Sequence, residues 1–277
     1  MLTAEKIMSL ALATAGLEDV PEDSGIIYDS GKPIKKAMFG VDMEAAELLI
    51  AKELGYDAVI THHPKGGSPM VNLYKVMENQ IERMVQAGVP INRAQKALEE
   101  RKGEVERASH VGNFDRAVSA ARALNMTFIG IHTPADIIAE KTVQEHLNRS
   151  LRRNPKAKLK DVLEVLRKLP EYAKVPAGPV IRVGSEESYA GKVWVTMAGG
   201  TGGGKEVAKA YFEAGVGTLV VMHMPENVIK AVKEQNIGNV VVAGHMSSDS
   251  VGINRIIAAL ESKGLEITRM SGVISPD

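Results

Sequence analysis

The chain has 277 residues, and its 34 Lys+Arg balance 34 Asp+Glu, so the formal charge at pH 7 is zero. Nucleic acids and membrane surfaces are usually bound by proteins with a basic excess, so we expect neither as a partner. There is no cysteine, which excludes disulfides and thiolate metal sites. Any bound metal must use imidazole and carboxylate ligands, a donor set that suits zinc, manganese, iron or nickel.

Residues 1–16 are largely apolar, with leucine and alanine at helical spacing. Glu5 stands beside Lys6 and no basic segment precedes the apolar run, so the pattern indicates an amphipathic helix and not a signal peptide. No apolar stretch of the sequence is long enough to span a bilayer. We therefore expect a cytoplasmic protein.

Strand and helix signals alternate in the first part of the chain, and a long helical stretch at about 72–124 interrupts them. We interpret residues 1–150 as a first α/β lobe that contains this helical insertion. The elements expected around the insertion are strands at 36–41, 57–61 and 127–131 and a helix at 43–54.

The alternation returns after a helical, locally basic segment at 140–169 and a linker marked by Pro170, Pro176, Gly178 and Pro179. We interpret 151–190 as helix and linker, and 191–277 as a second α/β lobe. Its expected elements are strands at 193–198, 218–222 and 240–243 and helices at 204–214, 226–235 and 247–263.

Each of the two lobes contains one copy of a short internal repeat. Residues 55–64 resemble residues 215–225, because each segment reads as a helix end, a strand, a histidine-containing turn and a proline. If the repeat is real, the fold class is α/β, with two similar lobes that face each other and the functional site between them.

Five residues are the main candidates for that site: each follows an apolar, strand-like run. Ligands in open α/β sheets collect outside the carboxyl ends of the strands. Imidazole is the commonest metal-binding side chain, and carboxylates can bridge two ions. Three such strand ends together predict one metal site, formed by His62, His63, Asp136, His245 and Asp249.

The spacing of these residues adds detail. His62 and His63 are adjacent on an extended turn, where side chains alternate in direction, so they suit two nearby ions better than one. His245 and Asp249 are four residues apart at a helix start, which places both on one face. Taken singly, a histidine pair is also typical of surface structure, and an aspartate in a first helical turn is favoured by the helix dipole.

Weaker candidates for substrate binding are His132, His223, Gly202, Gly203 and Lys205. His132 lies four residues before Asp136 and His223 occupies the repeat position of His62. The run 199–205 fits G-x-x-x-x-G-K, but Glu206 stands where a P-loop needs Ser or Thr, which disfavours an NTPase. Its backbone N–H groups remain able to bind a substrate phosphate, although a tight strand-to-helix connection explains the run equally well.

The motifs T-H-H-P at 61–64, H-T-P-A-D at 132–136 and G-H-M-S-S-D at 244–249, with the Gly-rich turn between the last two, resemble the Ngg-one-interacting-factor-three family. Its members are dinuclear-metal proteins, often described as type 2 GTP cyclohydrolase I. The resemblance extends from about Lys35 to the C-terminus. It implies two divalent ions, a two-lobed fold and a ring-shaped homo-oligomer, commonly a hexamer. It also implies metal ligands at His62, His63, Asp136, His245 and Asp249.

Two departures from the family concern the site. Asp249 stands where the family usually has Glu, so the shorter side chain should alter the ion spacing or hold one ion more weakly. The helical stretch at 72–124 lengthens the interval between the first two motifs, which could cap the site or change substrate access.

The leading functional hypothesis is a dinuclear metal-dependent hydrolase in which the ions activate water. Its small-molecule substrate would be a purine nucleotide, attacked at C8, or a phosphoester. The alternative is a metal-binding regulatory or metal-insertion partner protein without turnover. A third hypothesis is nucleotide binding by the 199–205 loop.

Overall fold

The computed structural model describes all residues from Met1 to Asp277 and consists of two compact units. The first unit comprises Met1–Val76, Val105–Ile138 and Asp249–Ser275, and the second comprises Met77–Glu104, Ala139–Ser248 and Pro276–Asp277. The chain thus returns to the first unit at its C-terminal end. The division expected from sequence, into 1–150, 151–190 and 191–277, places this end in the second lobe. The return occurs because the last strand pairs with the first unit's sheet.

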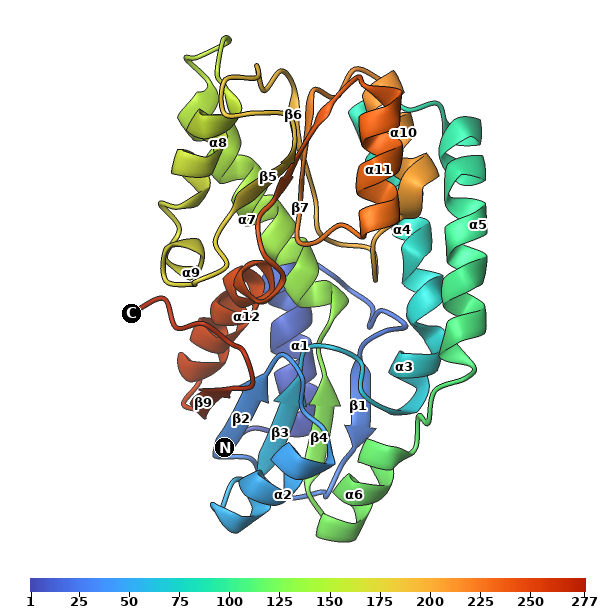
Figure 1. Cartoon of the computed structure of the whole chain (residues 1–277). Helices are drawn as coiled ribbons and strands as arrows, with labels where there is room; N and C mark the ends of the chain where they lie inside the picture. The colour runs from blue at the N-terminus through green and yellow to red at the C-terminus, as the bar shows by residue number, and fades with distance from the viewer. The chain divides into compact units, whose positions relative to one another are not determined.

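The first unit contains a five-stranded sheet with the order β1-β4-β3-β2-β9 (Figure 1). All neighbouring strands are parallel except β1, which is antiparallel to β4. Strands β3 and β4 are entirely buried, as expected of parallel strands covered on both faces. The strands are β1 (Gly25–Tyr28), β2 (Lys36–Gly40), β3 (Ala58–Thr61), β4 (Thr127–Gly130) and β9 (Glu266–Met270).

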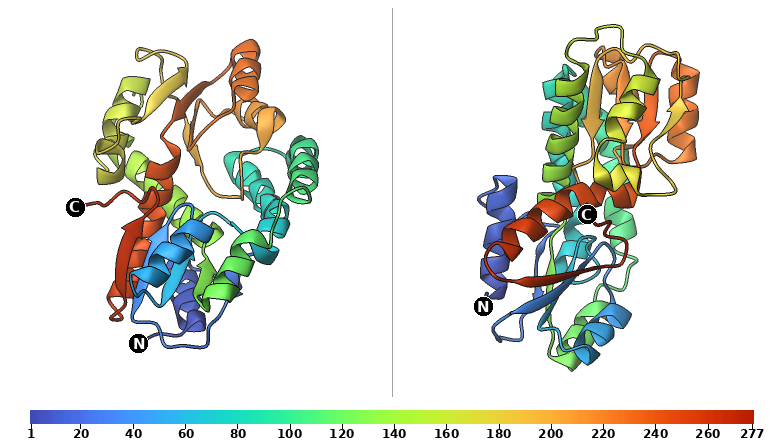
Figure 2. Two further views of the ribbon diagram at one scale, coloured as in Figure 1. Left: turned by 60° about the horizontal axis from the view of Figure 1, so that its bottom comes forward. Right: turned by 90° about the vertical axis from the view of Figure 1, so that its left-hand side faces the viewer.

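Helices cover both faces of this sheet (Figure 2). On one face, α1 (Ala4–Ala15) and α12 (His245–Glu261) pack against Ile60 and Ile129. On the other, α2 (Ala45–Glu53) and α6 (Arg116–Leu124) pack against Val59 and Phe128. Successive side chains of β3 and β4 therefore pack into the hydrophobic cores on opposite faces of the sheet, because side chains alternate in direction along a strand.

The second unit has a four-stranded sheet with the order β5-β8-β7-β6. Helix α7 (Thr133–Leu151) covers the edge of β6, because the Gln144 amide donates to Val193 O and accepts from Val195 N. The strands are β5 (Val180–Val183), β6 (Val193–Thr196), β7 (Thr218–Val221) and β8 (Asn239–Val242). The other helices are α8 (Leu159–Leu166), α9 (Pro170–Ala173), α10 (Gly204–Glu213) and α11 (Glu226–Gln235).

The two sheets repeat one topology, which confirms the α/β class with two similar units. Each contains a run of three parallel strands followed by an antiparallel edge strand, in the orders β2-β3-β4-β1 and β6-β7-β8-β5, and the first sheet adds β9 as a further parallel strand beside β2. Both edge strands shift register once, at Ile26/Tyr28 and at Ile181/Val183. The repeated segments of the sequence lie on the equivalent strands β3 and β7, so the similarity of these segments reflects a structural repeat.

The interval between β3 and β4 is helical, as the sequence predicted. It contains α3 (Gly67–Asn72), the 3₁₀ helix η1 (Leu73–Glu78), α4 (Asn79–Ala87), α5 (Ile91–Ser109) and α6. Helix α4 and most of α5 belong to the second unit, and α6 belongs to the first. No helix of the protein is both long and apolar enough to cross a membrane.

Candidate metal centre

The C-terminal edge of the first unit's sheet carries a cluster of buried polar side chains. His62 and His63 directly follow β3, and their N–H groups donate to Gly40 O and Val41 O, which continues the ladder with β2 past the strand end. His132 and Asp136 follow β4 at the start of α7, and Asp249 lies in the second turn of α12. His62 and Asp249 are fully buried.

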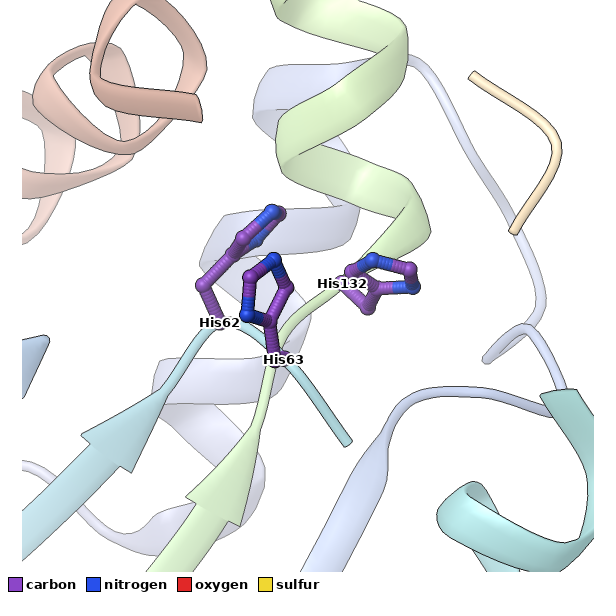
Figure 3. Close-up of side chains that lie close together, drawn as sticks. All are labelled: His62, His63 and His132. Atoms are coloured by element: carbon purple, nitrogen blue, oxygen red, sulfur yellow. The ribbon is translucent and has the colours of Figure 1, made fainter. Parts of the chain in front are cut away.

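Three imidazoles of the cluster lie close together (Figure 3), and each is held through Nδ1. Nδ1 of His62 donates to the Ile131 carbonyl at 3.1 Å, and Nδ1 of His63 to Asp42 Oδ1 at 2.9 Å. Nδ1 of His132 donates to Asp23 Oδ2 at 2.7 Å. Because an acceptor fixes a proton on Nδ1, Nε2 is the atom of each ring that can bind a metal.

The three Nε2 atoms lie among two carboxylates. His62 Nε2 is 3.3 Å from Asp136 Oδ1 and 3.6 Å from Asp249 Oδ1. His63 Nε2 is 3.6 Å from Asp249 Oδ2, and His132 Nε2 is 3.7 Å from Asp136 Oδ2. These distances are too long for good hydrogen bonds, and they leave space for ions between the donors.

The donor set fits a divalent metal. His62 Nε2 and Asp136 Oδ1 are buried and have no hydrogen-bond partner, a costly state that a bound ion would relieve. Ligand atoms from His62, His63 and His132 lie within 4.8 Å of one another, as do atoms from His62, Asp136 and Asp249. Imidazole and carboxylate together suit borderline divalent metals.

The two adjacent histidines differ in charge. Burial lowers the pKa of His62, but Asp249 and Asp136 raise it by more, so this pKa lies well above its usual value. Burial and the charge on His62 lower the pKa of His63 to about 4 despite the nearby Asp249. Without metal, a proton on His62 therefore balances the carboxylates, while His63 is neutral.

Asp23 and His132 form a second buried charged pair. Burial raises the pKa of Asp23, but His132, Thr133 and Ser24 lower it by more, so the net shift is downward. Burial likewise lowers the pKa of His132, whereas Asp136 and Asp23 raise it, so the net shift is upward.

A close helix contact brings the two carboxylates of the site together. A Cβ on Gly252 of α12 would lie 2.0 Å from the carbonyl oxygen of Ala135 at the start of α7. Only glycine allows the two backbones to approach so closely. Asp136 follows Ala135 directly and Asp249 precedes Gly252 by one turn, so this contact fixes the separation of the two side chains.

His245 and His223 belong to the second unit. His245 is the exposed first residue of α12, one turn before Asp249 on the same helix. His223 follows β7, and its ring centroid is 4.6 Å from that of His245. The strand register aligns His223 with His63 and not with His62, because each is the second residue after its strand.

The Gly-rich loop at 199–204 has a structural explanation. The Gln80 amide of α4 donates to Gly199 O at 2.8 Å and to Thr201 O at 2.7 Å. A Cβ added to Gly199 would lie 2.6 Å from Cγ of Gln80, and one added to Gly203 would lie 2.4 Å from Gln80 Oε1, so both would collide with this side chain. The loop thus wraps around a buried glutamine. Of the remaining loop candidates, Lys205 and Gly202 are exposed.

Sequence reasoning missed Asp42 and Asp23. Asp42 lies two residues after β2, so the rule that identified His62 would also have found it. Asp23 precedes β1, whose antiparallel direction places its start at the same sheet edge as the ends of β3 and β4. A rule that considers only the carboxyl ends of parallel strands cannot find it.

No protein-family model and no curated protein matches the chain. Among solved structures, a NIF3 superfamily protein from Sphaerobacter thermophilus is 35% identical, with a TM-score of 0.94 and 98% of each chain covered. Reduced HcgD from Methanocaldococcus jannaschii is 16% identical, with a TM-score of 0.61 and 97% of each chain covered. A Bacillus cereus protein related to NIF3 is 11% identical, with a TM-score of 0.53 over 97% of this chain and 96% of that one. The latter two share the fold, whereas the first also confirms the resemblance of the motifs: the chain belongs to the NIF3 (Ngg-one-interacting-factor-three) superfamily.

Proposed function

We propose that the protein is a metal-dependent hydrolase with a dinuclear centre at the C-terminal edge of the first unit's sheet. One observation supports this proposal above all: the buried His62 ring, oriented through Nδ1, faces the Asp136 carboxylate, and His62 Nε2 and Asp136 Oδ1 have no hydrogen-bond partner. Buried polar atoms without hydrogen bonds are costly unless a ligand completes them.

The residues proposed to hold two divalent ions are His62, His63, Asp136, His245 and Asp249. The first three and Asp249 lie at one sheet edge of the first unit, and His245 lies one helical turn before Asp249. Asp249 is shorter than the Glu that is usual in the family, so we expect one ion to be held more weakly. Zinc, manganese, iron and nickel all suit the ligands.

When bound, divalent ions lower the pKa of water and stabilise negative charge on a substrate. The chain's own contribution is orientation and burial. Asp42 and the Ile131 carbonyl fix the rings of His63 and His62, and the buried surroundings strengthen electrostatic interactions. The proposed substrate is a small molecule, either a purine nucleotide or a phosphoester. We further propose a cytoplasmic, ring-shaped homo-oligomer, commonly a hexamer in this family.

A second candidate function is a metal-binding partner protein without turnover. It is favoured by the exposed apolar side chains Val111 and Phe114, which are 87% and 51% exposed in the connection between α5 and α6. Both are large apolar side chains exposed on one short connection, where a protein partner can reach them.

The test measures metal content by elemental analysis in wild type, His62→Ala and Asp136→Ala, with the exposed His110→Ala as control. We expect about two divalent ions per chain in wild type and the control, and a loss in both site variants. Hydrolysis of GTP and of simple phosphoesters is then measured on the same samples. Activity that is absent from His62→Ala supports the hydrolase. Metal without any hydrolysis favours the partner protein, and a wild type that binds no added metal overturns both.

A further inference from the structure

We infer that His132 is a further imidazole ligand of the metal centre, in addition to the proposed His62, His63 and His245, and that Asp23 is the carboxylate that orients it. This inference rests on the proposed function, since it adds a residue to the proposed centre. The family's implied ligand set does not include His132, and the sequence suggested it only as a weaker candidate for substrate binding.

The geometry of His132 is that of a ligand. Its Nδ1 donates to a fixed acceptor, as do the Nδ1 atoms of His62 and His63, so its Nε2 is available on the side of the cluster. Its ring centroid lies 4.8 Å from that of His62 and 5.8 Å from that of His63. One potential ligand atom from each of these three residues lies within 4.8 Å of the others. Figure 3 shows the three rings gathered beyond the end of β3 and at the start of α7.

The internal repeat supports the same conclusion independently. His132 and Asp136 are four residues apart where α7 begins after β4. His245 and Asp249 have the same spacing where α12 begins after β8, the equivalent strand of the second unit. The second copy is one residue longer between strand and histidine, at Gly244, whose φ of 113° accommodates the extra residue. His132 is thus the counterpart of His245, a proposed ligand.

Asp23 holds the His132 ring in one orientation. It is fully buried, and its Oδ2 accepts from both His132 Nδ1 and Thr133 Oγ1 at 2.7 Å. Ser24 Oγ accepts from the His132 N–H at 3.0 Å, which fixes the backbone of the same residue. Carboxylates that accept from the distal nitrogen of a ligating histidine fix its orientation and raise its basicity, and their loss typically weakens metal binding 10–100-fold.

The experiment measures zinc stoichiometry and affinity by competition with a chromophoric chelator. The variants are His132→Ala and Asp23→Asn, with Thr133→Val as a matched control that removes another hydrogen bond to Asp23 Oδ2 but keeps the imidazole. We expect His132→Ala to lose one ion or bind it more than about 100-fold more weakly, and Asp23→Asn to bind about 10–100-fold more weakly. Thr133→Val should keep wild-type affinity. A merely structural role of Asp23 would instead weaken Thr133→Val and Asp23→Asn alike.

A second measurement uses the wild type, so its result does not depend on whether the variants fold. In the cobalt(II)-loaded protein, each imidazole bound through Nε2 retains an exchangeable Nδ1–H whose NMR signal is shifted by the metal. We expect such a signal from His132 in addition to those of His62 and His63. Two bound ions with no shifted His132 signal, or unchanged zinc affinity in a folded His132→Ala, overturn this inference and leave the proposed function intact. A wild type without metal overturns both.

Discussion

At the scale of single residues, the site depends on which atom of each histidine is occupied. The three rings use three different acceptors: a backbone carbonyl for His62, the half-exposed Asp42 for His63, and the buried Asp23 for His132. A carbonyl cannot be removed by substitution, but the two carboxylates can. The site therefore allows the orientation of a ring to be altered while its imidazole is kept.

The Asp42→Ala substitution tests orientation at His63. Asp42 also pairs with Lys65 at 2.6 Å, and its side chain is 49% exposed, so the substitution should cost less than about 1 kcal/mol of stability. Loss of the acceptor from His63 Nδ1 should nevertheless weaken metal binding about 10-fold. Chelator competition measures the affinity. Glu44→Gln is the control, because Glu44 pairs with Lys65 but not with a histidine. Equal affinities in Asp42→Ala and the control would contradict the expectation.

The Asp23–His132 pair predicts how the stability of the metal-free protein varies with pH. The lowered pKa of Asp23 and the raised pKa of His132 mean that both are charged in the folded state over a wider range than in the unfolded state. The pair's stabilisation is therefore fully present between about pH 4 and pH 6.5, the ordinary values of the two groups. It is lost as the pH rises through the raised pKa of His132 or falls through the lowered pKa of Asp23.

Thermal unfolding followed by circular dichroism in the presence of a chelator measures this effect. The difference in midpoint between wild type and Asp23→Asn should be largest near pH 5 and should shrink towards about pH 9. A difference that stays constant or grows over this range would show that the charge of His132 does not stabilise the fold.

The rule that ligands collect beyond the carboxyl ends of strands explains which site residues can be predicted from sequence. His62, Asp136 and Asp249 follow apolar runs that are recognisable without a structure, and the first unit brings all three together. Asp23 follows no such run. Its place depends on the antiparallel pairing of β1 with β4, and a pairing between residues so far apart leaves no local signal in the chain.

At the scale of elements, one glycine determines how two helices meet. Gly252 lies in the interior of α12, where glycine costs about 1 kcal/mol relative to alanine. The contact with the Ala135 carbonyl explains this cost. A glycine inside an otherwise regular helix is a sequence signal of close packing, and here it lies one turn from a proposed ligand.

We predict that Gly252→Ala destabilises the protein by about 3 kcal/mol, despite the better helix propensity of alanine, because a backbone carbonyl cannot move aside as a side chain can. It should also weaken metal binding by separating Asp249 from Asp136. Chemical denaturation and chelator competition measure the two effects. Gly202→Ala is the control, since its Cβ would enter open space. A Gly252→Ala variant as stable as this control would refute the proposed contact.

The strands that the sequence did not predict share a position in the fold. Strands β1, β5 and β9 are all edge strands of their sheets. Their residues are partly exposed, so neither a continuous apolar run nor a strict alternation marks them. The central strands β3, β7 and β8 were predicted to within one or two residues, because burial on both faces requires continuous apolar runs.

At the scale of the whole molecule, the chain contains two copies of one α/β topology that share some polar residues at equivalent places and differ at others. His63 corresponds to His223, and His132 to His245. Asp23, two residues before the start of β1, corresponds to Gly178 before β5. The first copy alone thus has the buried carboxylate that orients a histidine, which is why the buried cluster lies in the first unit's sheet and has no full equivalent in the second.

Metal should stabilise the whole molecule, and by an amount that depends on pH. A ligand that binds only the folded state at about 100 times its Kd adds roughly 2.7 kcal/mol to the free energy of unfolding. The raised pKa of His62 means that a proton occupies the ligand position in the metal-free state, whereas His63, with a pKa of about 4, is already neutral. Metal must displace the proton from His62, so the apparent affinity for metal rises as the pH approaches that pKa from below.

We therefore expect the zinc-induced rise in the unfolding midpoint to be larger at about pH 8 than at about pH 6. Differential scanning fluorimetry with and without zinc measures this, and His62→Ala, which has no such proton, should lose most of the rise at both values. A rise in wild type that is independent of pH would mean that zinc does not compete with a proton at His62.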